Sequence, residues 1–406
     1  MPFRPRPLIM SATGATALVV LALTGCVPNA QPGDATITVR ITDDACEVST
    51  ATAVAGNVTF ALISTGSDVN EFEILGDDKL RIVGEKENVV PDATTSYTVQ
   101  LEPGTYYTAC KFQMTGPPIG LAEFTVTGEA AGPGSGEQAL IDEAVENYIG
   151  YVKSQAGELI PAVAAFADAY AAGDDQTARD LFASTRVFYE RIEPTAEAFG
   201  DLDPKIDYRE VDAVAAGLEW TGFHRMEKDL WPPAAGSLNS DGTSAFLDWA
   251  PSTPDERATL AEQLVTDVQA LYDLVDADDF SITLADISNG AISLLDEVAV
   301  GKITGEEDWW SHTDLTDFAG NVQGAAVAFG NVKAIAVAAG DEGSDLADEI
   351  QQRFDGLEAL LAQYGSVEAG FTPYDTVTDA QRRELSDGVN ALAEPLSLLT
   401  STVLGV

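Results

Sequence analysis

Two hydrophobic patterns divide the chain near residue 130. Between residues 35 and 127 apolar and polar residues alternate in short runs, as in Ile37, Val39 and Ile41, which is the period of a half-buried strand. Turn residues such as Pro103-Gly104 separate the runs. About seven short strands at this spacing are typical of a Greek-key sandwich. The further strands are expected at 58–64, 71–75, 97–101, 105–110 and 121–127.

Residues 128–137 are rich in glycine and predict a flexible linker. From 138 to 406 the apolar residues recur at helical spacing, and alanine-rich helices with short connections favour antiparallel bundles. The sequence therefore predicts a multidomain protein, all-β and then all-α, in which the helices form two packed bundles. The later helices are expected at 254–276, 284–300, 313–338, 343–364 and 379–401.

The start of the chain has the pattern of an export signal. Residues 1–25 combine Arg4 and Arg6 with a short apolar run, and Leu23-Thr-Gly-Cys26 resembles the cleavage and lipidation site of bacterial lipoproteins. We expect Cys26 to be the lipidated first residue of the mature chain, followed by a tether over 26–34. This predicts a protein anchored by lipid to the extracytoplasmic face of the cell membrane.

The net negative charge of the chain limits which partners it can bind. The chain carries 66 acidic and 21 basic residues, a formal charge of −45. Such a surface repels nucleic acid and concentrates cations, although acidic surfaces also serve solubility or salt tolerance. We therefore expect no nucleic-acid partner.

One stretch, Trp220 to Trp231, carries the clearest candidate chemistry. It holds His224, one of only two histidines, and Glu227 three residues later. The stretch has no proline before Pro232, so a helix can place both side chains on one face. The alternative is a surface contact between His224 and Glu227 beside two core tryptophans.

Carboxylates upstream strengthen a metal-binding interpretation. Glu190 and Glu193 are also three residues apart near a predicted helix end, and Asp207 follows in a connection. Helical bundles that hold iron present Glu and Glu-x-x-His inward from facing helices. Carboxylates with one imidazole suit ferric iron better than soft metals. The alternative is that Glu190 and Glu193 lie in water and pair with Arg186 and Arg191.

Several ordered motifs together resemble the EfeO-type iron uptake lipoproteins. They are Tyr189-Glu-Arg-Ile-Glu-Pro, Leu202-Asp-Pro-x-Ile-Asp, Trp220-Thr-Gly-Phe-His-x-x-Glu-x-x-Leu-Trp and Lys302-Ile-Thr-Gly-Glu-Glu-Asp308.

The resemblance implies a cupredoxin-like domain over 35–127 and an imelysin-like, peptidase-family domain over 138–406. It implies an iron site at His224, Glu227, Glu190, Glu193 and Asp207, and with less support from the motifs at Glu297. It also implies an iron permease in the membrane and a haem peroxidase of the same uptake system as partners.

The β domain departs from the blue-copper pattern, because it contains no histidine. The resemblance implies that Cys46, Cys110 and Glu71 bind copper or ferric iron and help to oxidise ferrous iron. Met114 follows Cys110 and is a further candidate ligand. The competing interpretation is a structural Cys46–Cys110 disulfide in an oxidising compartment.

Three alternatives to iron capture remain at this point. A zinc peptidase needs two neighbouring histidines, whereas His312 is far from His224 in the sequence. Ferroxidase chemistry would place the reaction in the β domain. A purely structural surface protein would leave the clustered donors unexplained.

Overall fold

The alternating N-terminal region forms two sheets. The computed structural model describes residues 36–406 except 78, 80–81, 114–117, 130–134 and 248. The leader, Cys26, the tether and Met114 lie outside the described residues. The strands of this region are β1 Ile37–Ile41, β2 Cys46–Val48, β3 Thr52–Val54, β4 Gly56–Ser64, β5 Asn70–Leu75, β6 Ile82–Val89, β7 Thr94–Leu101, β8 Gly104–Phe112 and β9 Ile119–Thr127.

One sheet has the order β2-β1-β4-β7 and the other β3-β9-β8-β5-β6. The pairs β1–β4 and β3–β9 are parallel, and the remaining pairs are antiparallel. Alternate residues of β4 are buried, and Phe60 contacts Phe72 with ring centroids 5.1 Å apart. The prediction of a β domain is confirmed, and three strands, β2, β3 and β6, add to those expected.

Cys46 and Cys110 form a disulfide with a Cα–Cα distance of 5.7 Å. Cys46 begins β2 in one sheet, and Cys110 lies in β8 of the other. The bond therefore fastens the two sheets together, as the structural interpretation of these cysteines predicts.

The second region is helical, as predicted. Its α-helices are α1 Ser135–Ala171, α2 Asp175–Glu190, α3 Leu202–Ile206, α4 Glu210–Ala216, α5 Gly222–Leu230, α6 Pro254–Asp276, α7 Leu284–Val300, α8 Asp314–Ala338, α9 Asp341–Leu361, α10 Asp379–Leu396 and α11 Leu399–Leu404. The 3-10 turns are η1 Glu193–Phe199, η2 Lys302–Thr304 and η3 Tyr374–Thr376, and a small hairpin joins β10 Gly365–Ser366 to β11 Gly370–Phe371.

Side-chain caps explain why several helices begin where the sequence predicts. Thr253 and Glu256 form a capping box at α6, and Thr283 and Asp286 form another at α7. Each box satisfies two backbone donors that have no partner inside the helix. The predicted ranges 254–276 and 284–300 agree with these two helices.

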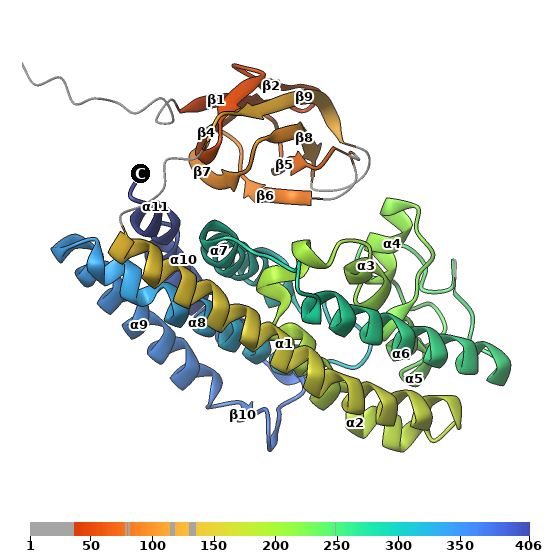
Figure 1. Ribbon diagram of the computed structural model, residues 1–406. Helices are drawn as coiled ribbons and strands as arrows, with labels where there is room; N and C mark the ends of the chain where they lie inside the picture. Colours follow the sequence, from red (N-terminus) through yellow and green to blue (C-terminus); the bar gives the residue numbers. More distant parts are fainter. Residues whose placement is uncertain (1–35, 78, 80–81, 114–117, 130–134, 248) are drawn as a thin grey trace, which may run out of the picture. The chain divides into compact units, whose positions relative to one another are not determined.

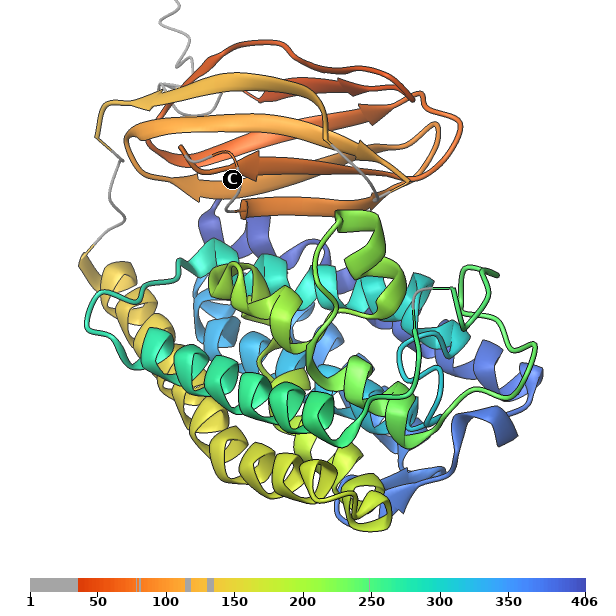
Figure 2. The same ribbon diagram turned by 90° about the vertical axis from the view of Figure 1, so that its right-hand side faces the viewer.

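One continuous core of buried residues extends through the helices, so the two bundles expected from the sequence share it. Helix α1 runs beside α6 and also contacts α8, and the short helices α3, α4 and α5 gather near one end (Figures 1 and 2). Helix α7 contacts strands β6 and β7. Lys86 pairs with Asp296 there (2.5 Å), and Asn289 Nδ2 donates to Thr98 O (2.7 Å). Within the described residues no helix is long and apolar enough to span a membrane.

Candidate metal centre

Helix α5 carries the central pair of side chains into the interior. His224 is 2% exposed and Glu227 is 1% exposed. The helix begins at Gly222, whose φ of +78° favours glycine. A Cβ on this residue would lie 2.2 Å from the carbonyl oxygen of Ile206, at the end of α3. The absence of a side chain thus lets the start of α5 pack directly against α3, next to Asp207.

Glu227 fixes the orientation of the imidazole. Its Oε1 accepts the backbone N–H groups of Trp310 (3.0 Å) and Ser311 (2.8 Å). His224 Nδ1 donates to its Oε2 at 3.3 Å. A carboxylate held in this way selects the tautomer in which Nε2 is free to bind a metal.

His224 Nε2 is buried and has no hydrogen-bond partner among the described residues. Its nearest carboxylate oxygens are Glu307 Oε1 at 3.5 Å and Asp207 Oδ1 at 3.8 Å. One ligand atom from each of the three residues lies within 4.8 Å of the other two, so a single ion could contact all of them. Two carboxylates and one imidazole suit a hard or borderline cation such as iron.

A second group lies on the other side of the ring. His224 Nδ1, Glu227 and Asp308 also lie within 4.8 Å of one another, with Nδ1 3.9 Å from Asp308 Oδ1. Glu227 is already occupied by three donors, and Asp308 is fully buried. The Nε2 side is the more open of the two, since Asp207 and Glu307 are 8% and 6% exposed.

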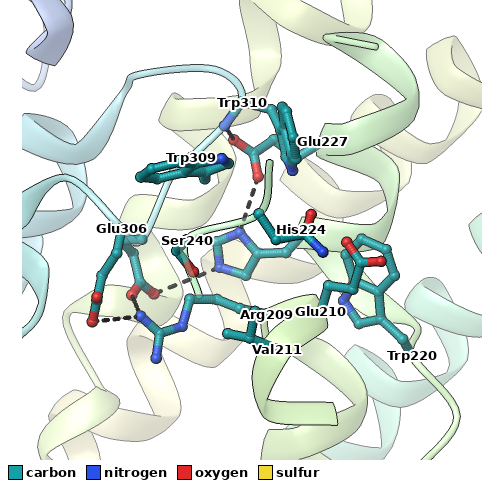
Figure 3. A pocket seen from close by; sticks show the side chains of 12 residues that line it. Arg209, Glu210, Val211, Trp220, His224, Glu227, Ser240, Glu306, Trp309 and Trp310 are labelled. Carbon is teal, nitrogen blue, oxygen red and sulfur yellow. Dashed lines mark hydrogen bonds and ion pairs between the residues drawn. The ribbon is translucent and has the colours of Figure 1, made fainter. Parts of the chain in front are cut away.

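A small pocket leads to this more open side (Figure 3). It has room of about 20 Å³, which suits one ion or one water molecule. Figure 3 shows Trp309 and Trp310 above the ring of His224 and the Arg209–Glu306 pair (2.8 Å) at the other side of the opening. The other lining residues are Glu210, Val211, Trp220, Glu227, Asn239, Ser240 and Glu307.

The segment 305–313 between η2 and α8, called the strap below, encloses the site. It supplies the side chains of Glu307 and Asp308 and the backbone donors of Trp310 and Ser311. Glu307 and Asp308 are not among the ligands predicted from the sequence. Their sequence signal is Gly305-Glu-Glu-Asp308, a run of acids at the end of the Lys302–Asp308 motif.

Buried cations balance part of the negative charge. Arg186 on α2 is fully buried and pairs with Asp207, with Glu190 (2.5 Å) and with Asp317 (3.0 Å). It also lies 3.6 Å from Glu307 and 3.8 Å from Asp308. Removing one partner of such a network leaves an uncompensated buried charge.

Glu190 and Glu193 meet, but around a lysine and not around His224. Lys302 Nζ lies 2.7 Å from Glu193 and 3.5 Å from Glu190. The predicted helical pair is also interrupted, because α2 ends at Glu190 and Glu193 begins η1, where Pro194 occupies the first turn. Glu297 on α7 acts on the same lysine, since its negative charge helps to raise the pKa of Lys302.

The groups around His224 favour a charged imidazole. Burial and Arg186 lower the pKa of His224, but the hydrogen bond to Glu227, the nearby carboxylate of Glu307 and the charge of Asp207 outweigh them and raise this pKa to about 9. Burial raises the pKa of Glu307, whereas Lys302 and His224 lower it to well below its usual range. The proton on His224 therefore takes the place that a metal ion would take, and an incoming ion must displace it.

The β domain carries another acidic group. Glu71 and Glu73 on β5 and Glu85 on β6 place carboxylate oxygens within 4.8 Å of one another. Lys111 pairs with Glu73 at 2.5 Å and with Glu71 at 3.6 Å. Burial and the charge of Glu85 raise the pKa of Glu71 well above its usual value.

The structure does not bring Cys46, Cys110 and Glu71 together as one ligand set. Glu71 pairs in register with Lys111, and Phe72 pairs with Cys110. Adjacent strand residues point to opposite faces, so Cys110 faces the core with Phe72 while Glu71 faces away. The two sulfurs are also bonded to each other and offer no thiolate.

Comparisons with known proteins agree with this architecture. Residues 144–399 match the family model described as Imelysin, and residues 15–120 match the model described as Cupredoxin-like domain. The iron uptake system component EfeO of Escherichia coli K12 is 35% identical over 408 residues, which cover 100% of this chain and 99% of that protein. This chain belongs to the EfeO family.

Other members give similar values. The protein of the same name from Shigella flexneri is also 35% identical over 408 residues. That of Escherichia coli O1:K1 is 36% identical over 374 residues, which cover 91% of this chain and 92% of its own. The resemblance of the four sequence motifs to EfeO-type proteins is thus confirmed, and so are the cupredoxin-like and imelysin-like domains.

Of the residues predicted for the site of this EfeO-family protein, the structure groups His224, Glu227 and Asp207. It adds Glu307 and Asp308. It places Glu190 and Glu193 against Lys302 and not against the imidazole, and the charge of Glu297 helps to raise the pKa of this lysine. His312 is in none of the grouped sets of the described residues.

Proposed function

We propose that this chain captures iron as cargo outside the cytoplasm and passes it to a permease in the membrane. His224 Nε2, Asp207 and Glu307 would hold the ion, and Glu227 would orient the imidazole. The observation that carries the proposal is the buried Nε2 without a hydrogen-bond partner, facing two carboxylates from different elements. The names of the EfeO relatives as iron uptake components support iron as the ion.

The charges of the site favour the binding of a cation. Arg186 and Lys302 are fixed within the cluster, and the acids around them still outnumber the basic groups. A cation entering beside His224 therefore reduces mutual repulsion among the carboxylates. Nothing in this gain depends on a change in the oxidation state of the ion, so ferrous and ferric iron are both candidate cargo.

The first prediction tests the ligand role of His224. Iron should stabilise the wild-type chain by about 2.7 kcal/mol at a hundredfold excess over its Kd, because the ion binds only the folded state. His224→Ala should lose this shift in melting temperature. Glu227→Gln should keep it with an affinity about 10–100-fold weaker, as expected for a residue that orients a ligand.

The matched control is His312→Asn, which removes the only other histidine. Asparagine is chosen because His312 has a φ of +59°, which asparagine tolerates. This variant should bind iron like the wild type. If His224→Ala binds iron at wild-type affinity while its melt stays cooperative, the site is elsewhere.

Delivery to a membrane partner requires that the chain stay near the membrane. We propose that Cys26 is the anchor, that the iron permease receives the ion, and that a haem peroxidase belongs to the same system. Mass spectrometry of the mature protein should find a diacylated or triacylated Cys26 at the N-terminus. Cleavage at another position with a free N-terminus would contradict this prediction.

A further inference from the structure

The ammonium group of Lys302 is surrounded by carboxylate oxygens. It is 4% exposed, and its Nζ contacts carboxylates from three separate segments: Glu193 of η1 at 2.7 Å, Glu190 of α2 at 3.5 Å and Glu307 of the strap at 3.7 Å. A lysine ammonium is charged at neutral pH, and the surrounding carboxylates stabilise this charge. The side chain is therefore an internal cation.

The oxygens around Lys302 are held in place by groups other than the lysine. Asn321 Nδ2 donates to Glu190 Oε2 at 2.9 Å and to Glu193 Oε2 at 2.6 Å. Carboxylate oxygens are the donors that hard cations prefer, and three glutamates supply them here.

Glu307 connects this position to the iron site. The same oxygen, Oε1, lies 3.5 Å from His224 Nε2 and 3.7 Å from Lys302 Nζ. A carboxylate between two cation positions is the arrangement of dinuclear centres in helical bundles, where glutamates from several helices and a helical Glu–His pair hold two ions. Here an ammonium group stands at the second position.

We propose that Lys302 occupies the place of a second metal ion and thereby restricts this carboxylate cluster to one iron. The inference rests on the proposed function of His224 as the first ion's ligand. A fixed positive charge among Glu190, Glu193 and Glu307 repels a second cation and also takes up the oxygens that it would need. Lys302 is thus a specificity-determining residue, and it sets the number of ions bound.

The test compares metal stoichiometry in Lys302 variants of the full mature chain, with Mn²⁺ as the probe. Equilibrium dialysis and metal analysis should find one Mn²⁺ per wild-type chain and two per Lys302→Ala chain. Lys302→Arg keeps the charge and should bind one. Lys333→Ala removes a partly buried lysine that pairs with Gln351, away from the cluster, and should also bind one.

A second readout follows the distance between the ions. Two Mn²⁺ ions that share the Glu307 carboxylate should be spin-coupled, so Lys302→Ala should lose the six-line electron paramagnetic resonance spectrum of an isolated ion. The double variant His224→Ala, Lys302→Ala should bind one ion and regain the six-line spectrum. This result would assign the additional ion to the lysine position.

Lys302→Gln guards against a loss of folding in the alanine variant, since an amide can still donate to Glu193. The proposal is overturned if both neutral variants fold and bind a single Mn²⁺. It is also overturned if both stay unfolded in the presence of Mn²⁺, because the lysine is then only structural. Refolding with two bound ions supports it. A wild-type chain that binds no ion would sink the proposed function, whereas an ion gained by Lys302→Ala would still support this inference.

Discussion

Without metal, the protein should lose stability as the pH rises from 5 to 8. Asp314 at the start of α8 is 3% exposed, and burial raises its pKa to about 7. A carboxyl group with a higher pKa in the folded chain keeps its proton on folding. Its contribution to stability is therefore complete below the unfolded pKa and is lost as the pH rises through the folded pKa.

Other buried groups with raised pKa values also make the protein less stable as the pH rises. Burial raises the pKa of Asp203 to about 7 and that of Glu297 to about 8. The pKa of His224 is raised to about 9, so its contribution is complete below its unfolded pKa and is lost as the pH rises through the folded value. Glu190 and Glu307 have lowered pKa values, and their contributions are lost only in stronger acid.

The expected loss of stability between pH 5 and pH 8 is large. Between pH 5 and its folded pKa of about 7, Asp314 alone loses about 3 kcal/mol of its contribution. In a chain of this length the melting temperature should then fall by about 4 °C from this group between pH 5 and pH 8. Thermal melts in the presence of a chelator, at constant ionic strength, measure this directly.

Asp314→Asn provides the matched variant, because an amide does not titrate and should flatten the slope. Saturating Mn²⁺ should stabilise the protein more at pH 8 than at pH 5, since the ion replaces protons at the site. A melting temperature that is equal at the two pH values, or higher at pH 8, would contradict the prediction.

The second large effect is expected for Gly222→Ala. The new Cβ would lie 2.2 Å from the backbone oxygen of Ile206, and the φ of +78° adds strain for any residue with a side chain. Helix α5 must shift away from α3, which moves His224 away from Asp207. The free energy of unfolding should fall by several kcal/mol, on the order of a severe core substitution, and iron binding should be lost.

Gly217→Ala separates the effect of the close contact with Ile206 from the effect of backbone strain. Gly217 has a similar φ of +69°, but no atom lies within 4 Å of the Cβ position. It should therefore cost only about 1–2 kcal/mol, from backbone strain alone, and should bind iron normally. Equal stability losses in chemical denaturation of the two variants would show that the close approach of α5 and α3 is not needed.

Local signals made much of the fold predictable. Capping residues and Pro254 marked the start of α6, and the spacing of His224 and Glu227 placed both on one buried face of α5. Strand β6 escaped prediction because the middle of it, Gly84-Glu-Lys-Glu-Asn88, is charged and lacks apolar alternation. Residues that share a site can be predicted from the sequence when they lie on the same helix or strand.

The remainder of the site depends on tertiary contacts. Glu307 and Asp308 lie in the strap, which has no periodic pattern, and their approach to His224 depends on tertiary packing and not on local sequence. Glu190 and Glu193 pair with Lys302 and not with the imidazole. The spacing of the two glutamates in the sequence does not indicate that a lysine pairs with them. The register of β5 against β8 places Glu71 and Cys110 on opposite faces, and a register cannot be derived from one strand.

The strap has a kinetic consequence. It gives the ion one ligand, Glu307, and it also holds Glu227 through the N–H groups of Trp310 and Ser311. When it detaches, one ligand and the support of the imidazole are lost in the same event. We therefore expect the lifetime of the bound ion to follow the opening rate of this segment, on the microsecond-to-second scale of local unfolding. A receiving protein that pulled the strap open would shorten that lifetime without competing for the ion itself.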